Sequence, residues 1–388
     1  MSTDELVKDV LGAVADDARL PAGVAQAAWR RRTRMRITRA ATAAAALAAA
    51  ITVGVITVPP LVERDTPDVA TSVTWQGDIA ADLDRSIPVH RVAAGRVTLT
   101  AFAACEPTCS WYLLTHAGTG GYTGARWGWV DVAPSGRTAA VLEETLPARR
   151  IGLVDTTAAG HRRWIDLGRA VAGSVAWSPD GKRLLVTTYD RVPGLLADPA
   201  AEPDARQVRT GFAIVDVESG DAGFHDLPGD PDSAGLRDDL SWSRDGSLIW
   251  EDTGARQEPR KYYDLTGRSR PGPAQESSSD QPAGLSPDGR LLAMGGRSGS
   301  APFVVDVRSG DSTLLEPPGD HVIMRSLAWA DDTHLIAWAQ DRATAGSGKS
   351  RYRLVVVDVA GKQGVTPLTG WTGALSRPNW MPVLTTEP

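Results

Sequence analysis

The sequence has few of the residues that most metal and redox sites need. It contains only 2 cysteines in 388 residues, and the first of them is Cys105. This excludes a lipid-modified cysteine near the N-terminus and leaves too few thiols for a cysteine zinc site. The 6 histidines are scattered, and His90 and His116 do not have ligand spacing. We therefore predict no metal site and no cofactor. The net charge of -6 also argues against nucleic acid as a partner.

Two motifs of common enzyme classes are missing. No Gly-x-Ser-x-Gly sequence is present, which argues against a serine hydrolase of the usual layout. Residues 346–350 imitate the end of a phosphate-binding loop, but the required first glycine is replaced by Ala343. The following residues 351–359 are typical of a strand, so no helix N-terminus would face a phosphate. The sequence predicts no catalytic residue and favours a protein that is not an enzyme.

Charge is also absent from residues 40–62, and this run divides the chain. Residues 1–39 carry 8 basic and 5 acidic side chains, whereas residues 63–388 carry 33 basic and 42 acidic ones. A run of this length is enough to cross a bilayer core of about 30 Å. Arginines cluster before it, so the positive-inside rule places the N-terminus in the cytoplasm and the body outside. We predict a single-pass plasma-membrane anchor; a cleaved export signal and a soluble alanine-rich helix are the alternatives.

The head, residues 1–39, is predicted to be helical. Ser2 and Glu5 fit a capping box, and Leu6, Val10 and Val14 share one helix face. The segment is either a juxtamembrane helix on the bilayer or a docking helix for a cytoplasmic protein. Its acidic amphipathic helix and arginine cluster resemble the N-terminal segments of actinobacterial membrane proteins of the anti-sigma type. The histidine and cysteine zinc ligands of many such domains are absent.

Internal repetition is the main signal in the body. One short sequence recurs at intervals of 45, 65, 43, 44 and 51 residues, and its clearest copy is Trp-Ser-Pro-Asp-Gly at 177–181. A unit near 44 residues has the size of a four-stranded propeller blade. Serine, proline, aspartate and glycine suit successive positions of a tight turn, and a buried tryptophan is expected to end the strand before it. The residues to which we assign this structural role are Trp177, Pro179, Asp180, Gly181, Trp242, Asp245, Gly246, Pro287, Asp288, Gly289, Trp329 and Trp380.

Each unit also has a second half that reads as a strand and a glycine turn. Examples are residues 212–217 before Ser219-Gly220 and residues 303–307 before Ser309-Gly310. The turn and the Val-x-Asp strand resemble those of TolB-type and WD-repeat-like β-propellers, over roughly residues 75–388. This resemblance implies an all-β fold and leaves the function open, because propellers serve many tasks.

Six blades are the predicted number. Five are bounded by the turn copies, and residues 75–130 supply three strands of the remaining blade. The C-terminal residues 379–381 are expected to be its fourth strand, which would close the ring and remove exposed sheet edges. The predicted organisation is thus a head (1–39), a transmembrane helix (40–62), a linker (63–74) and a six-bladed β-propeller (75–388).

The long irregular segments are expected on one face of the propeller. If the repeated turn joins strands one and two, the loops between strands two and three and between blades share the opposite face. Insertions gathered on one face are a usual place for binding. The segments are residues 190–211, 226–239, 252–260, 266–284 and 340–351. Cys105 and Cys109 fall on the same face, and outside the cytoplasm a disulfide is the natural interpretation.

Three functions follow from this reading. The first is a membrane-anchored, extracytoplasmic and non-enzymatic binding module whose loop-rich face recognises a protein, peptide or glycan. The second is a transmembrane regulator, similar to anti-sigma proteins, whose head binds a cytoplasmic regulatory factor. The third is a hydrolase or lyase that uses carboxylates gathered from several blades in the channel, such as Asp238 and Asp239.

Overall fold

The computed structural model describes only part of the chain. The described residues are 77–105, 109–115, 120–157, 162–191, 209–229, 238–253, 258–296, 301–346, 348–361 and 363–386. The predicted head, transmembrane helix and linker lie outside these ranges. Within the ranges, helix is limited to two short 3-10 turns, η2 (Glu276–Ser278) and η3 (Arg342–Thr344), and neither could span a membrane.

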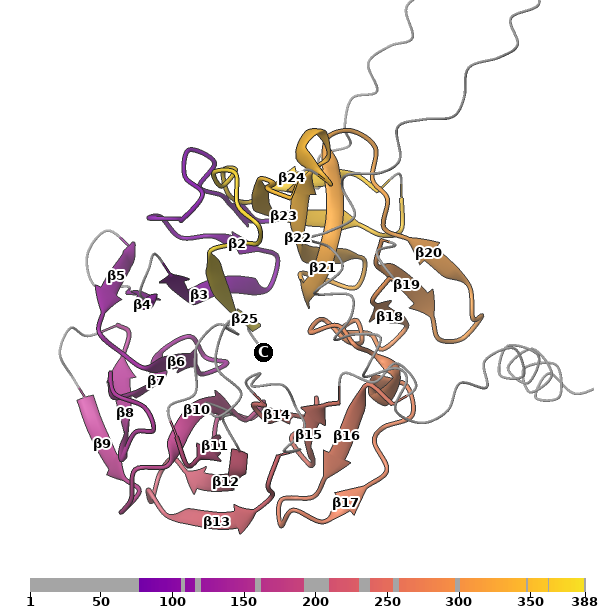
Figure 1. The fold of residues 1–388 in the computed structure, drawn as a ribbon. Coiled ribbons are helices and arrows are strands. Elements are labelled where there is room, and N and C mark those ends of the chain that lie inside the picture. The colour runs from indigo at the N-terminus through magenta and orange to yellow at the C-terminus, as the bar shows by residue number, and fades with distance from the viewer. Residues whose placement is uncertain are drawn as a thin grey trace, which may run out of the picture. The chain divides into compact units, whose positions relative to one another are not determined.

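Six antiparallel sheets form the described body, and they follow one another around a centre (Figure 1). We number them as blades 1 to 6 along the chain. Blades 2, 3, 4 and 6 have four strands in sequence order, blade 5 has three, and blade 1 includes the last strand of the chain. The protein is therefore an all-β, six-bladed propeller, as the repeats predict.

The strands of blades 1 to 3 are as follows. Blade 1 contains β1 (Ile79–Ala80), β2 (Ala93–Ala94), β3 (Val97–Cys105), β4 (Cys109–Leu114), β5 (Tyr122–Ala125) and β25 (Trp380–Thr386); blade 2 contains β6 (Trp129–Val132), β7 (Thr138–Leu142), β8 (Arg150–Asp155) and β9 (Arg162–Asp166); blade 3 contains β10 (Ala172–Trp177), β11 (Arg183–Tyr189), β12 (Arg209–Asp216) and β13 (Ala222–Asp226).

The strands of blades 4 to 6 complete the ring. Blade 4 contains β14 (Ser241–Trp242), β15 (Ile249–Asp252), β16 (Arg260–Tyr263) and β17 (Ser269–Arg270); blade 5 contains β18 (Leu291–Met294), β19 (Phe303–Asp306) and β20 (Ser312–Leu314); blade 6 contains β21 (His321–Trp329), β22 (His334–Asp341), β23 (Tyr352–Asp358) and β24 (Val365–Pro367).

The two ends of the described body meet in blade 1. Strand β25 pairs antiparallel with β3, with Trp380 opposite Ala104 and Thr386 opposite Val97 (Figure 1). The predicted closure is confirmed, and the pairing runs further than the three residues expected. The sequence did not predict β1 and β2, which form a hairpin with the start of β3.

A buried serine explains the repeated turn. In blade 3, Ser178 Oγ donates to Asp180 Oδ1 at 2.5 Å and accepts from Arg183 N at 2.9 Å. Ser243 and Ser286 make the equivalent bonds in blades 4 and 5, and all three serines are fully buried. The glycine that ends the turn has a positive φ, such as 68° at Gly181, which suits a residue without a Cβ. In blades 3 and 4 the turn joins the first two strands, and in blade 5 it leads into β18.

Among the described residues, apolar clusters fill five of the six junctions between blades. One of them joins blades 6 and 1, where Trp380 packs against Trp338 and Phe102 at centroid distances of 4.8 and 5.5 Å. The other four join blades 1 and 2, 2 and 3, 3 and 4, and 5 and 6. The junction of blades 4 and 5 is different, because polar contacts dominate it.

Candidate functional site

The segment after β17 forms the unusual junction. It turns through η2 and passes between blades 4 and 5, at the place where other blades have an inner strand. Blade 5 keeps only an isolated bridge there, between Leu285 and Leu292. Backbone groups of this segment therefore need other partners, and the Arg260 side chain of blade 4 bonds to two of its carbonyls.

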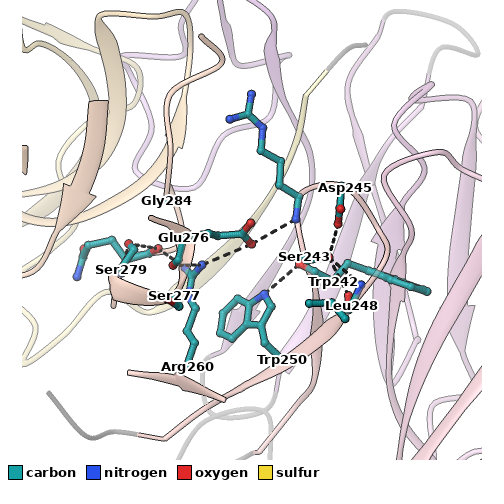
Figure 2. Close-up of polar contacts among 12 residues, drawn as sticks. Trp242, Ser243, Asp245, Leu248, Trp250, Arg260, Glu276, Ser277, Ser279 and Gly284 are labelled. Carbon is teal, nitrogen blue, oxygen red and sulfur yellow. Dashed lines mark hydrogen bonds and ion pairs between the residues drawn. The ribbon is translucent and has the colours of Figure 1, made fainter. Parts of the chain in front are cut away.

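Arg260 is the central side chain of the junction. Its guanidinium is buried and lies 4.0 Å from the ring centre of Trp250 (Figure 2). Its nitrogens donate to the carbonyls of Gln281 at 2.8 Å and Glu276 at 3.3 Å, and the Glu276 carboxylate is 3.9 Å away. A planar guanidinium suits this combination of ring stacking and several directed hydrogen bonds.

Glu276 lies between the two blades and is also buried. Its Oε1 accepts a hydrogen bond from the backbone N–H of Arg244, which belongs to the blade 4 turn (Figure 2). Burial raises the pKa of Glu276, while the Arg244 N–H and the Arg260 charge act in the opposite direction. Burial likewise raises the pKa of the neighbouring Tyr262 to about 12, so its phenol is neutral at physiological pH.

A pocket of about 350 Å³ opens beside this network. Its walls come from the residues leading into β16, from the end of β17 and the loop after it, from η2, and from the end of β18. These are the strand ends that carry the loops between strands two and three and between blades. The lining residues are Glu258, Pro259, Arg260, Lys261, Tyr262, Ser269, Arg270, Pro271, Gly272, Ser277, Ser278 and Met294.

The pocket wall is rich in hydrogen-bond donors. It includes three cationic side chains and three serines, and Glu258 is the one carboxylate among the lining residues. Arg270 is paired with Asp264 at 2.7 Å, and Lys261 lies 3.9 Å from Glu251. This composition suits the binding of a ligand with acceptor groups. Among the described residues, no group of three or more histidine, cysteine, aspartate or glutamate side chains could hold a metal ion.

The sequence-predicted residues lie elsewhere. Apart from Trp380, the repeat-turn residues are at the opposite ends of the strands, where they shape the blades. Trp380 was expected to end a strand before a turn, but it begins β25 and lies opposite Ala104, at the end of β3 that carries the disulfide. Trp177, Trp329 and Trp380 are buried as expected, while Trp242 is only half-buried. Cys105 and Cys109 are joined by a disulfide at the end of the β3–β4 hairpin. Asp238 and Asp239 contact Arg209 and Tyr189 between blades 3 and 4.

The predicted loop-rich face is described only in part. Residues 192–208, 230–237 and 254–257 lie outside the described ranges. The part that is described includes the insertion at 266–284, and this segment forms η2 and one wall of the pocket. Arg260 and Glu276 were not singled out from the sequence, because neither belongs to a motif and their contact depends on the path of the chain between blades.

Comparisons with known proteins add similarity of fold. No family model and no curated protein matches the sequence. Among solved structures, TolB from Acinetobacter baumannii is 17% identical with a TM-score of 0.42, and the match covers 75% of this chain and 66% of that one. The putative TolB from Agrobacterium tumefaciens is 13% identical with a TM-score of 0.37, covering 69% and 92% of the two chains.

An enzyme is among the similar structures too. The oligogalacturonate lyase solved in complex with manganese is 13% identical with a TM-score of 0.42, covering 75% of this chain and 86% of that one. At these identities and scores, none of the three likenesses bears on function. The propeller assignment rests on the strand pairing described above.

Proposed function

We propose that the protein is a non-enzymatic binding module that takes its ligand on the loop-rich face, in the pocket between blades 4 and 5. The pocket itself is the observation that supports this proposal. Its volume of about 350 Å³ falls within the range of about 300–1,000 Å³ that is usual for ligand sites. It also occurs at a junction where, in the part of the chain that the structure describes, a polar network takes the place of an apolar cluster.

The lining favours a peptide or glycan ligand. Lys261, Arg270 and the serine hydroxyls of Ser277 and Ser278 offer donors to carbonyl, carboxylate or sugar oxygens. Arg260 is already engaged by Glu276 and two backbone carbonyls, so its role is to hold the pocket wall in place. In this proposal the pocket only binds and positions its ligand, and no bond of the ligand is broken.

The proposal includes the location expected from the sequence. Residues 40–62 would anchor the protein in the plasma membrane, with the propeller outside the cytoplasm. The uncharged run and the arginines before it support this arrangement. A saturable complex between the full chain and one cytoplasmic regulatory factor, abolished by Leu6→Glu in the head, would support the anti-sigma-like alternative instead.

Ligand arrays test the proposal. The full chain, purified in detergent, is applied to peptide and glycan arrays beside two variants. Ser278→Trp places a large ring at the pocket wall, while Ser309→Trp is a control at an exposed turn on the opposite side of blade 5. We expect the array signals to fall at least about tenfold for Ser278→Trp and to persist for Ser309→Trp. Signals that survive Ser278→Trp would contradict the proposal.

A further inference from the structure

A second surface, on the outer side of blade 2, combines arginines with tryptophans. Strand β9 begins Arg162-Arg163-Trp164, and both arginines are exposed. In the antiparallel register, Trp164 is opposite Gly152 and Asp166 is opposite Arg150. Because side chains alternate along a strand, Arg150, Trp164 and Arg162 share one side of the sheet.

On that side, the guanidinium groups of two arginines lie over the rings of two tryptophans. The Arg150 guanidinium lies 4.7 Å from the Trp164 ring centre. The Arg162 guanidinium lies 5.8 Å from Trp164 and 5.2 Å from Trp127, which belongs to the link between blades 1 and 2. We call Arg150, Trp164, Arg162 and Trp127 the arginine–tryptophan ladder. Contacts of guanidinium faces with rings leave the N–H edges free to meet carboxylates.

A glycine makes room for the ladder. A Cβ at Gly152 would meet the Trp164 ring at 3.1 Å and Val141 at 2.9 Å. The ring therefore lies directly on the backbone of β8. This close approach fixes Trp164, and with it the positions of the two arginines that flank it.

The two arginines of the arginine–tryptophan ladder differ in whether a carboxylate pairs with them. Arg150 is already paired with Glu143 at 2.6 Å. Arg162 contacts the two rings, and no carboxylate pairs with it among the described residues. An exposed cation that is held in place on an otherwise acidic body is suited to an acidic partner.

Besides the charge of Arg162, β9 offers a peptide an open strand edge. It is the outermost strand of blade 2, and within the described part of the chain it pairs with β8 alone. An outer edge of this kind accepts an extended peptide as a further strand. An acidic polysaccharide carries carboxylates but has no backbone amides that could pair with a strand, so the open edge of β9 favours a peptide.

We propose that β9 and the arginine–tryptophan ladder bind an extended acidic peptide segment of a partner protein. The segment would pair with β9 and place alternate carboxylates on the side of the sheet that carries Arg162. This site is separate from the pocket between blades 4 and 5, and the proposal does not depend on it.

The test measures binding of a labelled peptide of alternating glutamate and threonine to the full chain by fluorescence anisotropy. We expect saturable binding that Arg162→Gln weakens roughly three- to tenfold, because one exposed charge pair is lost. Gly152→Ala keeps every charge and is expected to weaken binding by displacing Trp164. The control Arg308→Gln removes an exposed arginine of blade 5 and should change nothing.

Two further probes separate strand addition from general charge attraction. A peptide with N-methyl groups on alternate amides keeps the carboxylates and cannot complete the strand pairing, so we expect roughly tenfold weaker binding. Polygalacturonate carries carboxylates without amides and should bind no better than that peptide. Equal binding of all three probes, an equal loss in Arg308→Gln, or no saturable binding would overturn the proposal. Ser278→Trp should leave peptide binding intact, which keeps this test independent of the pocket.

Discussion

Trp380 connects the two ends of the propeller, so its replacement should show how much the closure contributes to stability. The side chain is 4% exposed and packs against Phe102 and Trp338. Truncation of a buried tryptophan to alanine costs about 3–5 kcal/mol. With a urea m-value of about 3 kcal/mol per molar for a domain of this size, Trp380→Ala should lower the unfolding midpoint by about 1–1.7 M.

A second variant sharpens this prediction. The Trp380 indole nitrogen is buried and has no hydrogen-bond partner among the described residues. Trp380→Phe keeps most of the ring contacts and removes that unpaired donor, so we expect a loss below about 1.5 kcal/mol. Trp371→Ala, at a half-buried tryptophan in the link between blades 6 and 1, is the control for losing an indole. Urea unfolding followed by circular dichroism gives the three values. Equal losses for Trp380→Ala and Trp371→Ala would refute the reasoning about closure.

Three other perturbations follow from the described contacts. Ser286→Ala removes the buried hydroxyl that holds the blade 5 turn, and we expect a loss of about 1–3 kcal/mol in urea unfolding, with no loss showing that the turn is held otherwise. Burial raises the pKa of Asp131 to about 6, above the usual unfolded value near 3.9, so the free energy of unfolding should fall as pH rises from about 4 to 6. Asp131→Asn keeps an acceptor for the backbone N–H of Trp177. It should raise the free energy of unfolding by on the order of 1 kcal/mol at neutral pH and leave it unchanged at pH about 4, as measured by urea unfolding at the two pH values. A gain at both pH values would contradict burial of the charge as the cause. Arg260→Met leaves Glu276 buried without its cation and should cost about 3–5 kcal/mol, part of which Glu276→Gln should restore in the double variant in the same assay.

The fold could be predicted because its signals are local and repeated. The turn at 177–181 carries its own hydrogen bonds between residues at most five apart, so similar residues specify the same geometry in blades 3, 4 and 5. The start of the closing strand could be placed near residue 380 because the N-terminal part of the body supplied only three strands for its blade. The β1–β2 hairpin had no comparable signal, since each strand has two residues.

The candidate site could be predicted only in part. The long segment at 266–284 marks the junction at which the pocket lies, because such a length exceeds what a link between blades needs. The contacts that shape the pocket join Arg260 to residues 16 and 21 positions away, and neither end belongs to a pattern. The ladder on blade 2 depends on strand register, which places Trp164 over Gly152 and brings Arg162 to Trp127.

Hydrogen exchange with a bound ligand tests the central claim about function most directly. The full chain is compared with and without a ligand identified on the arrays, and protection is followed along the sequence. If the pocket between blades 4 and 5 is the binding site, protection will concentrate in residues 258–272 and 276–278 and will be lost in Ser278→Trp. Protection confined to the repeated turns, or spread evenly over all six blades, would contradict the claim.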